Sequence, residues 1–191
     1  DTWKYFLGNF EPPSTWSQIE FNDSDWLEGE SGFGYGDGDD ATIVPNIISV
    51  FVRKTFYIDS IEDISEAILH VDYDDAFVAY LNGIEIARNN IGNSEDGPPP
   101  YNQGADEWHE AVIFTGGFPE MFEIDLNNIP IQNGENVLSI QVHNYNAASS
   151  DMSLIPFLTL GLNYIPENPN GAPDILNLNA SNLHANFNLY H

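Results

Sequence analysis

Residues 37–42, which read DGDDAT, concentrate oxygen-bearing side chains in a pattern that suits a calcium ion. Calcium takes roughly six to eight oxygen ligands, and a glycine lets the backbone curl so that carboxylates, hydroxyls and carbonyls converge. Without a cation, the three carboxylates of this segment would repel one another. We therefore predict calcium ligands at Asp37, Asp39, Asp40 and Thr42, with a solvated acidic turn as the alternative.

A second group of aspartates, at positions 72, 74 and 75, ends one stretch that is predicted below to be a strand and precedes the next. Carboxylates at the end of a strand commonly accept hydrogen bonds from backbone N–H groups in a tight corner. That structural role is the alternative to a metal site here. We take Asp74 and Asp75 as a secondary candidate for metal binding.

Several aromatic and planar polar residues lie in predicted loops or at the ends of predicted strands. Recognition of a sugar needs flat aromatic faces for C–H contacts and planar polar groups for hydroxyls, usually in shallow loops. Each aromatic residue could instead pack in the core or anchor its loop, which is the alternative interpretation. The candidate ligand-binding residues are Trp108, Tyr101, Tyr35, Tyr145, Arg88 and Asn144.

The sequence shows no motif typical of catalysis. Its five histidines have neither the HExxH pattern nor another close ligand spacing, and there is no cysteine, GxSxG motif or phosphate-binding loop. Paired carboxylates occur throughout so acidic a chain and therefore discriminate nothing. We expect no enzymatic activity.

The charge balance limits the partners of the chain. Thirty acidic residues against four basic ones give a net charge of −26, which leaves little to bind a phosphate backbone. The same charge repels acidic polymers and anionic membranes and attracts divalent cations. No apolar stretch approaches the roughly 18 residues of a membrane helix, so we expect no membrane insertion. Neutral polysaccharides or oligosaccharides and calcium are the favoured partners.

The pattern of apolar residues predicts strands and almost no helix. β-branched and aromatic runs alternate with Gly-, Pro- and Asn-rich loops, of which residues 9–45 and 89–109 are the longest. Asn82-Gly83 predicts a tight hairpin, and the strand after Asn133-Gly134 shows one apolar face, as expected for a half-buried strand. This succession favours a sandwich or barrel. The predicted strands cover residues 50–58, 67–74, 77–88, 110–115, 121–126, 136–145 and 157–164.

Fragments along residues 1–164 carry a resemblance to a known family group. They read WKYF at 3–6, FNDSDW at 21–26, GFGYGDGDDAT at 32–42, RKTF at 53–56, DYDDAFVAYLNG at 72–83, GENVL at 134–138 and VHN at 142–144. The chain resembles galactose-binding-like jelly-roll domains, of the carbohydrate-binding-module type, found beside glycoside hydrolases and in secreted bacterial surface proteins. The resemblance implies an all-β antiparallel β-sandwich.

The same resemblance bears on the metal sites. Residues 37–42 are similar to the Asp-Gly-Asp-x-x-Thr loop that holds a structural calcium in many such domains, and Asp74-Asp75 resembles a calcium-binding pair of sugar-binding adhesins. The family often supplies a further acidic ligand from the last strand. Residues 157–164 lack one, and Asp151 is the possible substitute.

We expect two parts in the chain: a sandwich domain at 1–165, and a linker with the start of a following module at 166–191. The tail at 177–188 is similar to the opening of lamin-tail-like modules. The resemblance implies a non-catalytic, calcium-stabilised carbohydrate-binding module attached to a secreted or cell-surface protein that acts on polysaccharides. The alternative is a structural or adhesive spacer beside neighbouring domains, which binds calcium but no sugar.

Overall fold

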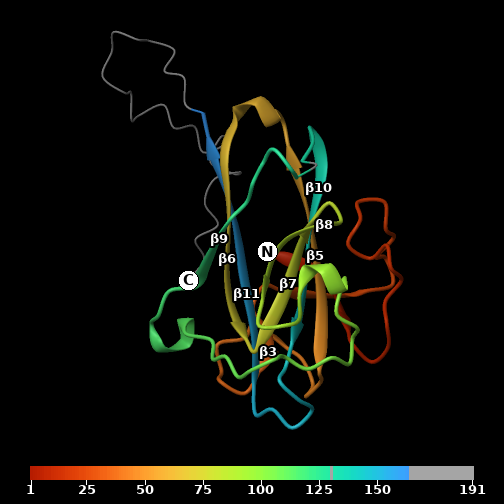
Figure 1. The fold of residues 1–191 in the computed structure, drawn as a ribbon, viewed down its shortest axis with the longest axis vertical. Helices are drawn as coiled ribbons and strands as arrows, with labels where there is room; N and C mark the ends of the chain where they lie inside the picture. The colour runs from red at the N-terminus through yellow and green to blue at the C-terminus, as the bar shows by residue number, and fades with distance from the viewer. Residues whose placement is uncertain (130, 164–191) are drawn as a thin grey trace.

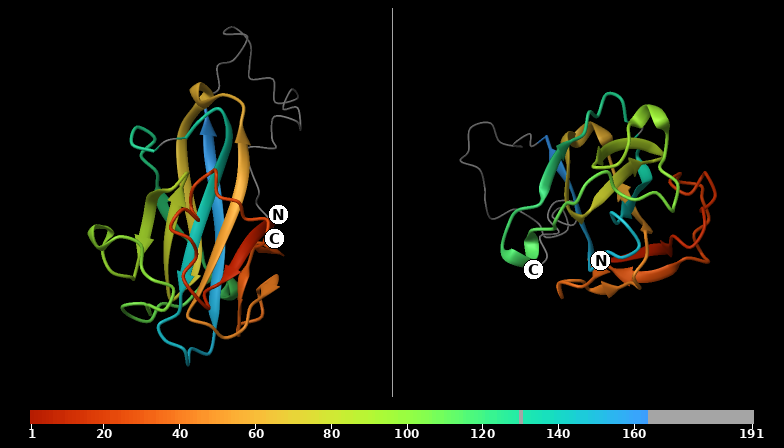
Figure 2. Two further views of the ribbon diagram at one scale, coloured as in Figure 1. Left: turned by 90° about the vertical axis from the view of Figure 1, so that its right-hand side faces the viewer. Right: turned by 60° about the horizontal axis from the view of Figure 1, so that its bottom comes forward.

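The computed structural model describes residues 1–129 and 131–163 of the chain. The linker and following module expected at 166–191 lie outside these described residues. The described part forms two β-sheets packed face to face, and Figures 1 and 2 show the two layers from three directions.

One sheet has six strands in the order β2-β1-β5-β10-β7-β8, and the other has five in the order β4-β3-β11-β6-β9. All pairings are antiparallel except the short edge pair of β3 with β4. The predicted antiparallel β-sandwich is confirmed. The strands are β1 Thr2–Leu7, β2 Leu27–Glu30, β3 Phe33–Tyr35, β4 Thr42–Ile43, β5 Ser49–Ile58, β6 Ile64–Asp74, β7 Ala76–Leu81, β8 Ile84–Asn89, β9 Glu120–Glu123, β10 Gly134–His143 and β11 Met152–Leu162.

The hairpin predicted at Asn82-Gly83 joins β7 to β8. Asn82 has φ 52° and Gly83 has φ 85°, which are the positive values that a tight two-residue turn of this kind requires. Strands β7 and β8 pair from Leu81↔Ile84 to Phe77↔Asn89, with a register shift after Ala79. The local turn chemistry and the tertiary structure therefore agree.

The prediction of a strand at 110–115 is wrong. This segment contains a short 3-10 turn, η3 (Ile113–Thr115), and the backbone N–H groups of Val112 and Ile113 donate to the side chain of Asp72 at 2.8–3.1 Å. A carboxylate thus takes the place of a neighbouring strand. The apolar run that suggested a strand contributes only Ala111 to the buried residues.

The core between the sheets follows the alternation of the strands. In β5, Val50 and Val52 face this core, whereas Phe51 and Arg53 project from the opposite face of the same sheet. From the other sheet, β6 contributes Leu69, Val71 and Tyr73. The other large members include Phe33, Phe77, Leu138, Ile140, Val142 and Leu154.

The outer face of the six-stranded sheet is also covered, which corrects the expectation that β10 is half-buried. All residues of β10 from Asn136 to His143 are buried. Trp16 and Trp26 are 4% and 9% exposed and lie over Phe51 and its neighbours. Loop residues from 8–26 and 89–109 therefore give this sheet a second apolar layer, which periodicity within one strand could not reveal.

Arg53 fastens the N-terminal loop to the sheet. Its guanidinium is buried, forms an ion pair with Asp23 at 2.8 Å, and donates to the carbonyls of Trp16 and Gln18. Its charge also lies 5.1 Å from the ring centre of Phe21. A buried charge is tolerated here because its Nε and Nη1 groups meet acceptors and an aromatic ring lies nearby.

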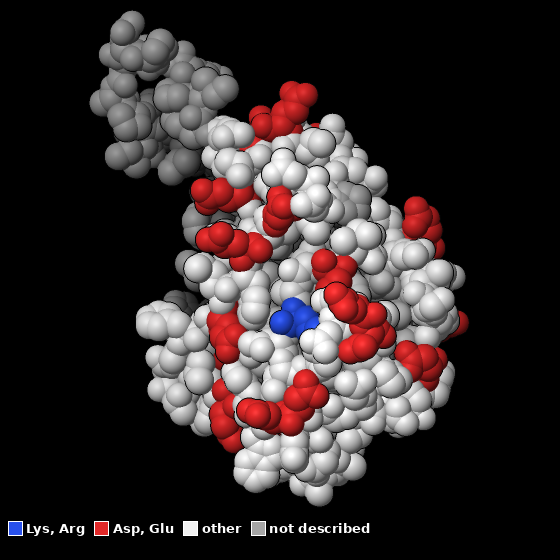
Figure 3. Space-filling model, viewed as in Figure 1, with Lys and Arg blue, Asp and Glu red and all other residues white. Residues whose placement is uncertain are grey.

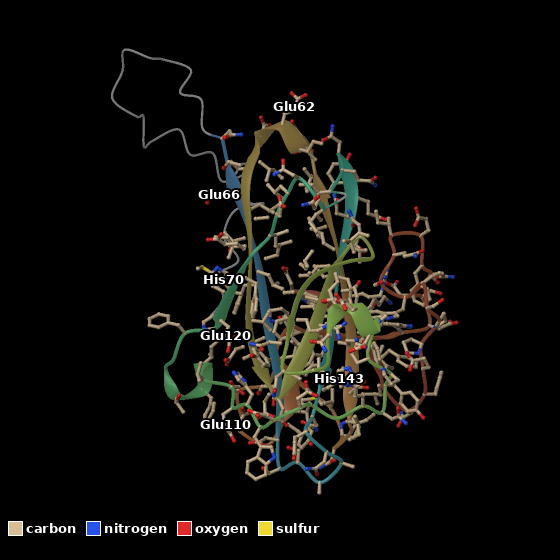
Figure 4. All side chains as sticks on the ribbon, in the orientation of Figure 1. Glu62, Glu66, His70, Glu110, Glu120 and His143 are labelled. Atoms are coloured by element: carbon tan, nitrogen blue, oxygen red, sulfur yellow. The ribbon has the colours of Figure 1, made fainter. Side chains whose placement is uncertain are left out.

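Three long loops gather at one end of the sandwich, which we call the loop end. In the five-stranded sheet, Ser153 at the start of β11 pairs with Gly34 of β3 on one side and with Asp74 of β6 on the other. In the other sheet, the first residue of β7 pairs with the last of β10. The loop end therefore collects residues 36–48, 90–119 and 144–151, and Figure 4 shows Glu110 toward this end, away from Glu62.

Helical structure within the described residues is limited to three short 3-10 turns, η1 (Ile61–Asp63), η2 (Ser94–Asp96) and η3. The described part of the chain holds no helix with the length and apolar character needed to cross a membrane. Acidic side chains are spread widely over the face seen in Figure 3, where basic surface is scarce, as the composition implies.

Candidate functional site

The acidic loop that follows β3 brings its three carboxylates together. Asp37, Asp39 and Asp40 each offer an oxygen within 4.8 Å of the others. Five of their six carboxylate oxygens are buried without a hydrogen-bond partner, and the sixth, Oδ2 of Asp37, accepts from Ser153 Oγ at 2.9 Å. We call this group the 37–40 cluster.

Glycines allow the 37–40 cluster to pack against the start of β11. A Cβ placed on Gly34 would clash with the carbonyl oxygen of Met152 and with the carboxylate of Asp40. Gly36 has φ 111°, and a Cβ there would lie 2.7 Å from the carbonyl oxygen of Ser150. The sequence GYG before the aspartates is thus needed for close approach as well as for the turn.

The electrostatics of this loop favour a bound cation. Burial and the negative charges of Asp37 and Asp39 raise the pKa of Asp40 to about 7. Burial, with the neighbouring carboxylate of Asp37, raises the pKa of Asp39 to about 6. Unpaired, partly desolvated carboxylates are poorly stabilised at neutral pH, and a hard divalent cation supplies the missing charge. The donor set therefore fits calcium.

Thr42, the fourth predicted ligand, lies in β4, where its Oγ1 donates to the carbonyl oxygen of Glu30 at 2.7 Å. The structure assigns its hydroxyl a hydrogen bond between neighbouring segments, and the prediction that it ligates a metal stays untested.

Two of the three aspartates at the end of β6 bind backbone N–H groups. Asp72 accepts from Val112 and Ile113, as described above. Asp75 accepts from His109 N at 2.9 Å through Oδ1 and from Tyr145 N at 2.6 Å through Oδ2. Both side chains thus fasten loops, which is the structural role weighed for them in the sequence.

Asp74 differs from its neighbours. It is 4% exposed, and its Oδ1 is buried with no hydrogen-bond partner. Carboxylate oxygens of Glu110 and Asp151 lie within 4.8 Å of it and of each other. Burial and the charges of Asp75 and Asp151 raise the pKa of Asp74 to about 8. Asp151, the expected closing ligand of the acidic loop, is therefore grouped with Asp74.

The four lysine and arginine side chains all lie in the described residues. Their ion pairs and hydrogen bonds are made with groups other than the carboxylates of the 37–40 cluster and of Asp74, Glu110 and Asp151. Each is engaged elsewhere. Lys4 pairs with Glu28 at 2.8 Å, Arg53 with Asp23 at 2.8 Å and Arg88 with Glu85 at 2.9 Å, and Lys54 Nζ donates to the Thr2 carbonyl at 2.8 Å.

Beside these carboxylates, two aromatic side chains form an exposed pair. Trp108 is 76% exposed and Tyr145 is 38% exposed. Their ring centres are 5.8 Å apart with an angle of 81° between the planes, an edge-to-face arrangement. The two residues come from different loops, so this pair, which we call the aromatic face, exists only in the folded chain.

Both loops are held firmly next to the exposed rings. On one side of Trp108, Asn90 exchanges hydrogen bonds with the backbone of Glu107, at 2.6 and 3.1 Å. On the other side, the ring of His109 stacks on Tyr73 with centres 4.0 Å apart. Asp75 binds the N–H groups of His109 and Tyr145 together. An exposed tryptophan on an anchored backbone is well suited to contact a ligand at low entropic cost.

The other predicted ligand residues occupy structural positions. Arg88 forms an ion pair with Glu85 and donates hydrogen bonds to the carbonyls of Ile91 and Gly97. It also lines an open groove along β8 and the loop that follows. Tyr101 is half-buried and packs on the outer apolar layer. Asn144 is fully buried and donates to Tyr35 Oη at 2.9 Å, while that hydroxyl donates to the Ser149 carbonyl.

Sequence reasoning missed the contribution of Glu110 and the opposite roles of neighbouring aspartates. Glu110 was assigned to a strand that does not form. Its signal was its place two residues after Trp108 in the longest loop, where chemistry-bearing residues are common. Which of Asp72, Asp74 and Asp75 finds N–H donors has no signal in the sequence, because the donors are 34 to 70 residues away.

No protein-family model and no curated protein matches the sequence. Among solved structures, the chain is similar to parts of glycoside hydrolase enzymes. A β-glucuronidase from glycoside hydrolase family 2 aligns at 18% identity over 75% of this chain and 13% of its own, with a TM-score of 0.45. A β-glucuronidase of an uncultured Clostridium species aligns at 21% identity over 75% and 21%, with a TM-score of 0.45.

A third similar structure is a calcium-binding mutant of Bacteroides uniformis β-glucuronidase 2. It aligns at 13% identity over 81% of this chain and 17% of its own, with a TM-score of 0.45. The chain thus spans about a fifth or less of the length of these three enzymes. These three likenesses concern the fold alone, and the description of the site rests on the geometry of the chain itself.

Proposed function

We propose that the sandwich domain expected at 1–165 is a non-catalytic carbohydrate-binding module whose ligand packs on the aromatic face of Trp108 and Tyr145. The observation that carries the proposal is the 76% exposure of Trp108 on a backbone anchored at both neighbouring residues. The exposed, edge-to-face pair of Trp108 and Tyr145 offers flat apolar surface, and a sugar ring offers C–H groups that fit such a face. Polar groups of the surrounding loops are available for the hydroxyls.

The charge of the chain supports a neutral polysaccharide or oligosaccharide as the ligand. The net charge of −26 opposes the approach of uronate-rich or sulfated polymers at low salt. Calcium in the 37–40 cluster would stiffen the loop after β3 and offset part of the negative charge there. This cluster is far in sequence from the aromatic face, so calcium would have a structural role. We include in the proposal that the module belongs to a secreted or cell-surface protein acting on polysaccharides, next to other domains.

The test is a binding screen of the full chain against immobilised neutral and acidic glycans, followed by calorimetry on each hit. Trp108→Ala should abolish binding to the hit. Tyr57→Ala is the matched control, because Tyr57 is 70% exposed but lies near the far end of β5, where it pairs with Glu135. It should bind as the unaltered chain does.

Binding that survives Trp108→Ala would contradict the assignment of the aromatic face. Release of reducing ends from a bound polysaccharide would contradict the non-catalytic role. If no glycan binds, while calcium raises the melting temperature, the chain is the calcium-stiffened structural or adhesive spacer instead.

A further inference from the structure

Asp74 is a buried carboxylate whose role the sugar-binding face does not explain. Its two acidic neighbours, Asp72 and Asp75, accept hydrogen bonds from backbone N–H groups. Asp74 is 4% exposed, and its buried Oδ1 has no partner. A buried carboxylate without donors or a counter-charge is costly when it is ionised, and a bound cation would stabilise its ionised form.

Two further carboxylates point to the kind of ligand. Oxygens of Glu110 and Asp151 lie within 4.8 Å of Asp74 and of each other. Glu110 is exposed, and Asp151 is half-buried with its Oδ1 accepting from Ser150 Oγ at 2.8 Å. Three negative groups at this separation repel one another unless a cation lies between them. The four basic side chains of the protein have partners elsewhere.

We propose that Asp74, Glu110 and Asp151 form a second divalent cation site, separate from the 37–40 cluster, that clamps together the two loops carrying Trp108 and Tyr145. The all-oxygen donor set is that of a hard cation, and one ligand from each of three separate segments suits the flexible geometry of calcium better than the strict octahedron of magnesium. Backbone carbonyls and water would complete the shell.

The chain path explains the clamp. Glu110 is two residues from Trp108, and Asp151 closes the loop that starts after β10 with Tyr145. Asp74 precedes Asp75, which already binds the backbone of both loops. A cation would add a second fastening on the same two loops and remove their mutual repulsion. The cation site stands on this geometry alone, whereas its effect on a bound sugar rests on the proposed function.

The first experiment counts calcium ions. The full chain, stripped of metal with a chelator, is titrated with calcium by calorimetry at neutral pH. We expect about two ions per chain, one for each carboxylate group. Asp74→Asn and Glu110→Gln should each lose one ion and keep the other. Glu107→Gln, which removes an exposed charge from the same loop outside the group, should keep both.

The outcomes separate this site from the 37–40 cluster. Asp39→Asn should lose the ion of the 37–40 cluster and keep the ion at Asp74. An ion that is kept in Asp39→Asn but lost in Asp74→Asn therefore supports the second site. Full calcium binding in both Asp74→Asn and Glu110→Gln would overturn it. Near-ultraviolet circular dichroism in the chelator checks that each variant folds, and the exposed position of Glu110 keeps the test valid if Asp74→Asn does not.

A second readout tests the clamp itself. Calcium should slow hydrogen exchange at the amides of residues 108–112 and 145–151 in the unaltered chain and in Asp39→Asn, but not in Asp74→Asn. Equal slowing in Asp74→Asn would overturn the clamp. Failure of the glycan screen would leave this result intact, so the two proposals can fail separately.

Discussion

The loop at 37–40 and the corner at 72–75 each place three aspartates within four residues at the same end of the sandwich, yet the structure treats them differently. In the loop, five of six carboxylate oxygens are buried without a partner. In the corner, two of three side chains bind backbone N–H groups of the long loops, and only Asp74 has a buried oxygen without a donor.

This difference teaches how a buried carboxylate is stabilised. An N–H group supplied by another segment fixes that segment in place, which Asp72 and Asp75 do for residues 109–113 and 145. Where no N–H group arrives, the charge calls for a cation instead. An aspartate therefore either holds a loop through hydrogen bonds or serves as a candidate metal ligand, depending on whether backbone N–H groups reach its carboxylate.

The largest expected effect separates Asp75 from Asp74. Asp75→Ala leaves the N–H groups of His109 and Tyr145 without an acceptor. A hydrogen bond to a charged group contributes about 1.5–3 kcal/mol, so we expect the loss of two to lower the free energy of unfolding by about 3–6 kcal/mol. Asp74→Ala in a chelator should leave it unchanged or raised, because that change removes a buried carboxyl group whose Oδ1 has no hydrogen-bond partner. Urea unfolding measures both, and equal losses would contradict the distinction.

Calcium should stabilise the unaltered chain through each cluster separately. A cation that binds only the folded chain adds about 2.7 kcal/mol per site when its free concentration is 100 times the dissociation constant. Asp39→Asn and Asp74→Asn should each lose the contribution of one site, and the double variant should lose both. Urea unfolding with calcium and with a chelator gives the difference, and magnesium at equal concentration is the control. A calcium effect that survives in the double variant would place the ions elsewhere.

The pH dependence of the metal-free chain should have an unusual sign. The pKa values of Asp40 and Asp74 are raised to about 7 and about 8 by burial and neighbouring charges, above the ordinary value of 3.8. Between the ordinary and the raised pKa the folded chain holds more protons than the unfolded one, so stability falls as pH rises. We expect the melting temperature in a chelator to fall between pH 6.5 and 8.

That window avoids an opposing group. Burial lowers the pKa of His143 from 6.5 to about 4. Below pH 6.5 the unfolded chain therefore binds a proton that the folded chain does not, and the folded chain loses stability as pH falls. The double variant Asp40→Asn, Asp74→Asn should flatten the slope between pH 6.5 and 8, and saturating calcium should do the same in the unaltered chain. A melting temperature that rises over this window in the chelator contradicts the account.

The smallest expected effect on stability belongs to Trp108. Its ring is 76% exposed and touches Tyr145 at its edge, so Trp108→Ala should change the free energy of unfolding by no more than about 0.5 kcal/mol. Urea unfolding checks this, next to the glycan-binding measurement. A loss of more than about 2 kcal/mol would show that the ring stabilises the fold, which is not expected of a ligand platform.

Much of the fold could be predicted from local pattern, but the assignment of roles within the site could not. The hairpin at Asn82-Gly83 and the long strand at 49–58 follow from turn chemistry and alternation. The strand expected at 110–115 does not form, because Asp72 binds its backbone. Of the six predicted ligand residues, Trp108 and Tyr145 meet at the surface, whereas Asn144 is drawn into the interior.

The sequence by itself determined the class of fold, the excess of negative charge and the acidic loop at 37–40, since each depends on neighbouring residues or on composition. Only the tertiary structure decided that Asp75 holds two loops, that Asp74 faces Glu110 and Asp151, and that Trp108 meets Tyr145. The physical reason is that a carboxylate or an aromatic ring acts through what lies opposite it, and here the partners are supplied by segments far away in the chain.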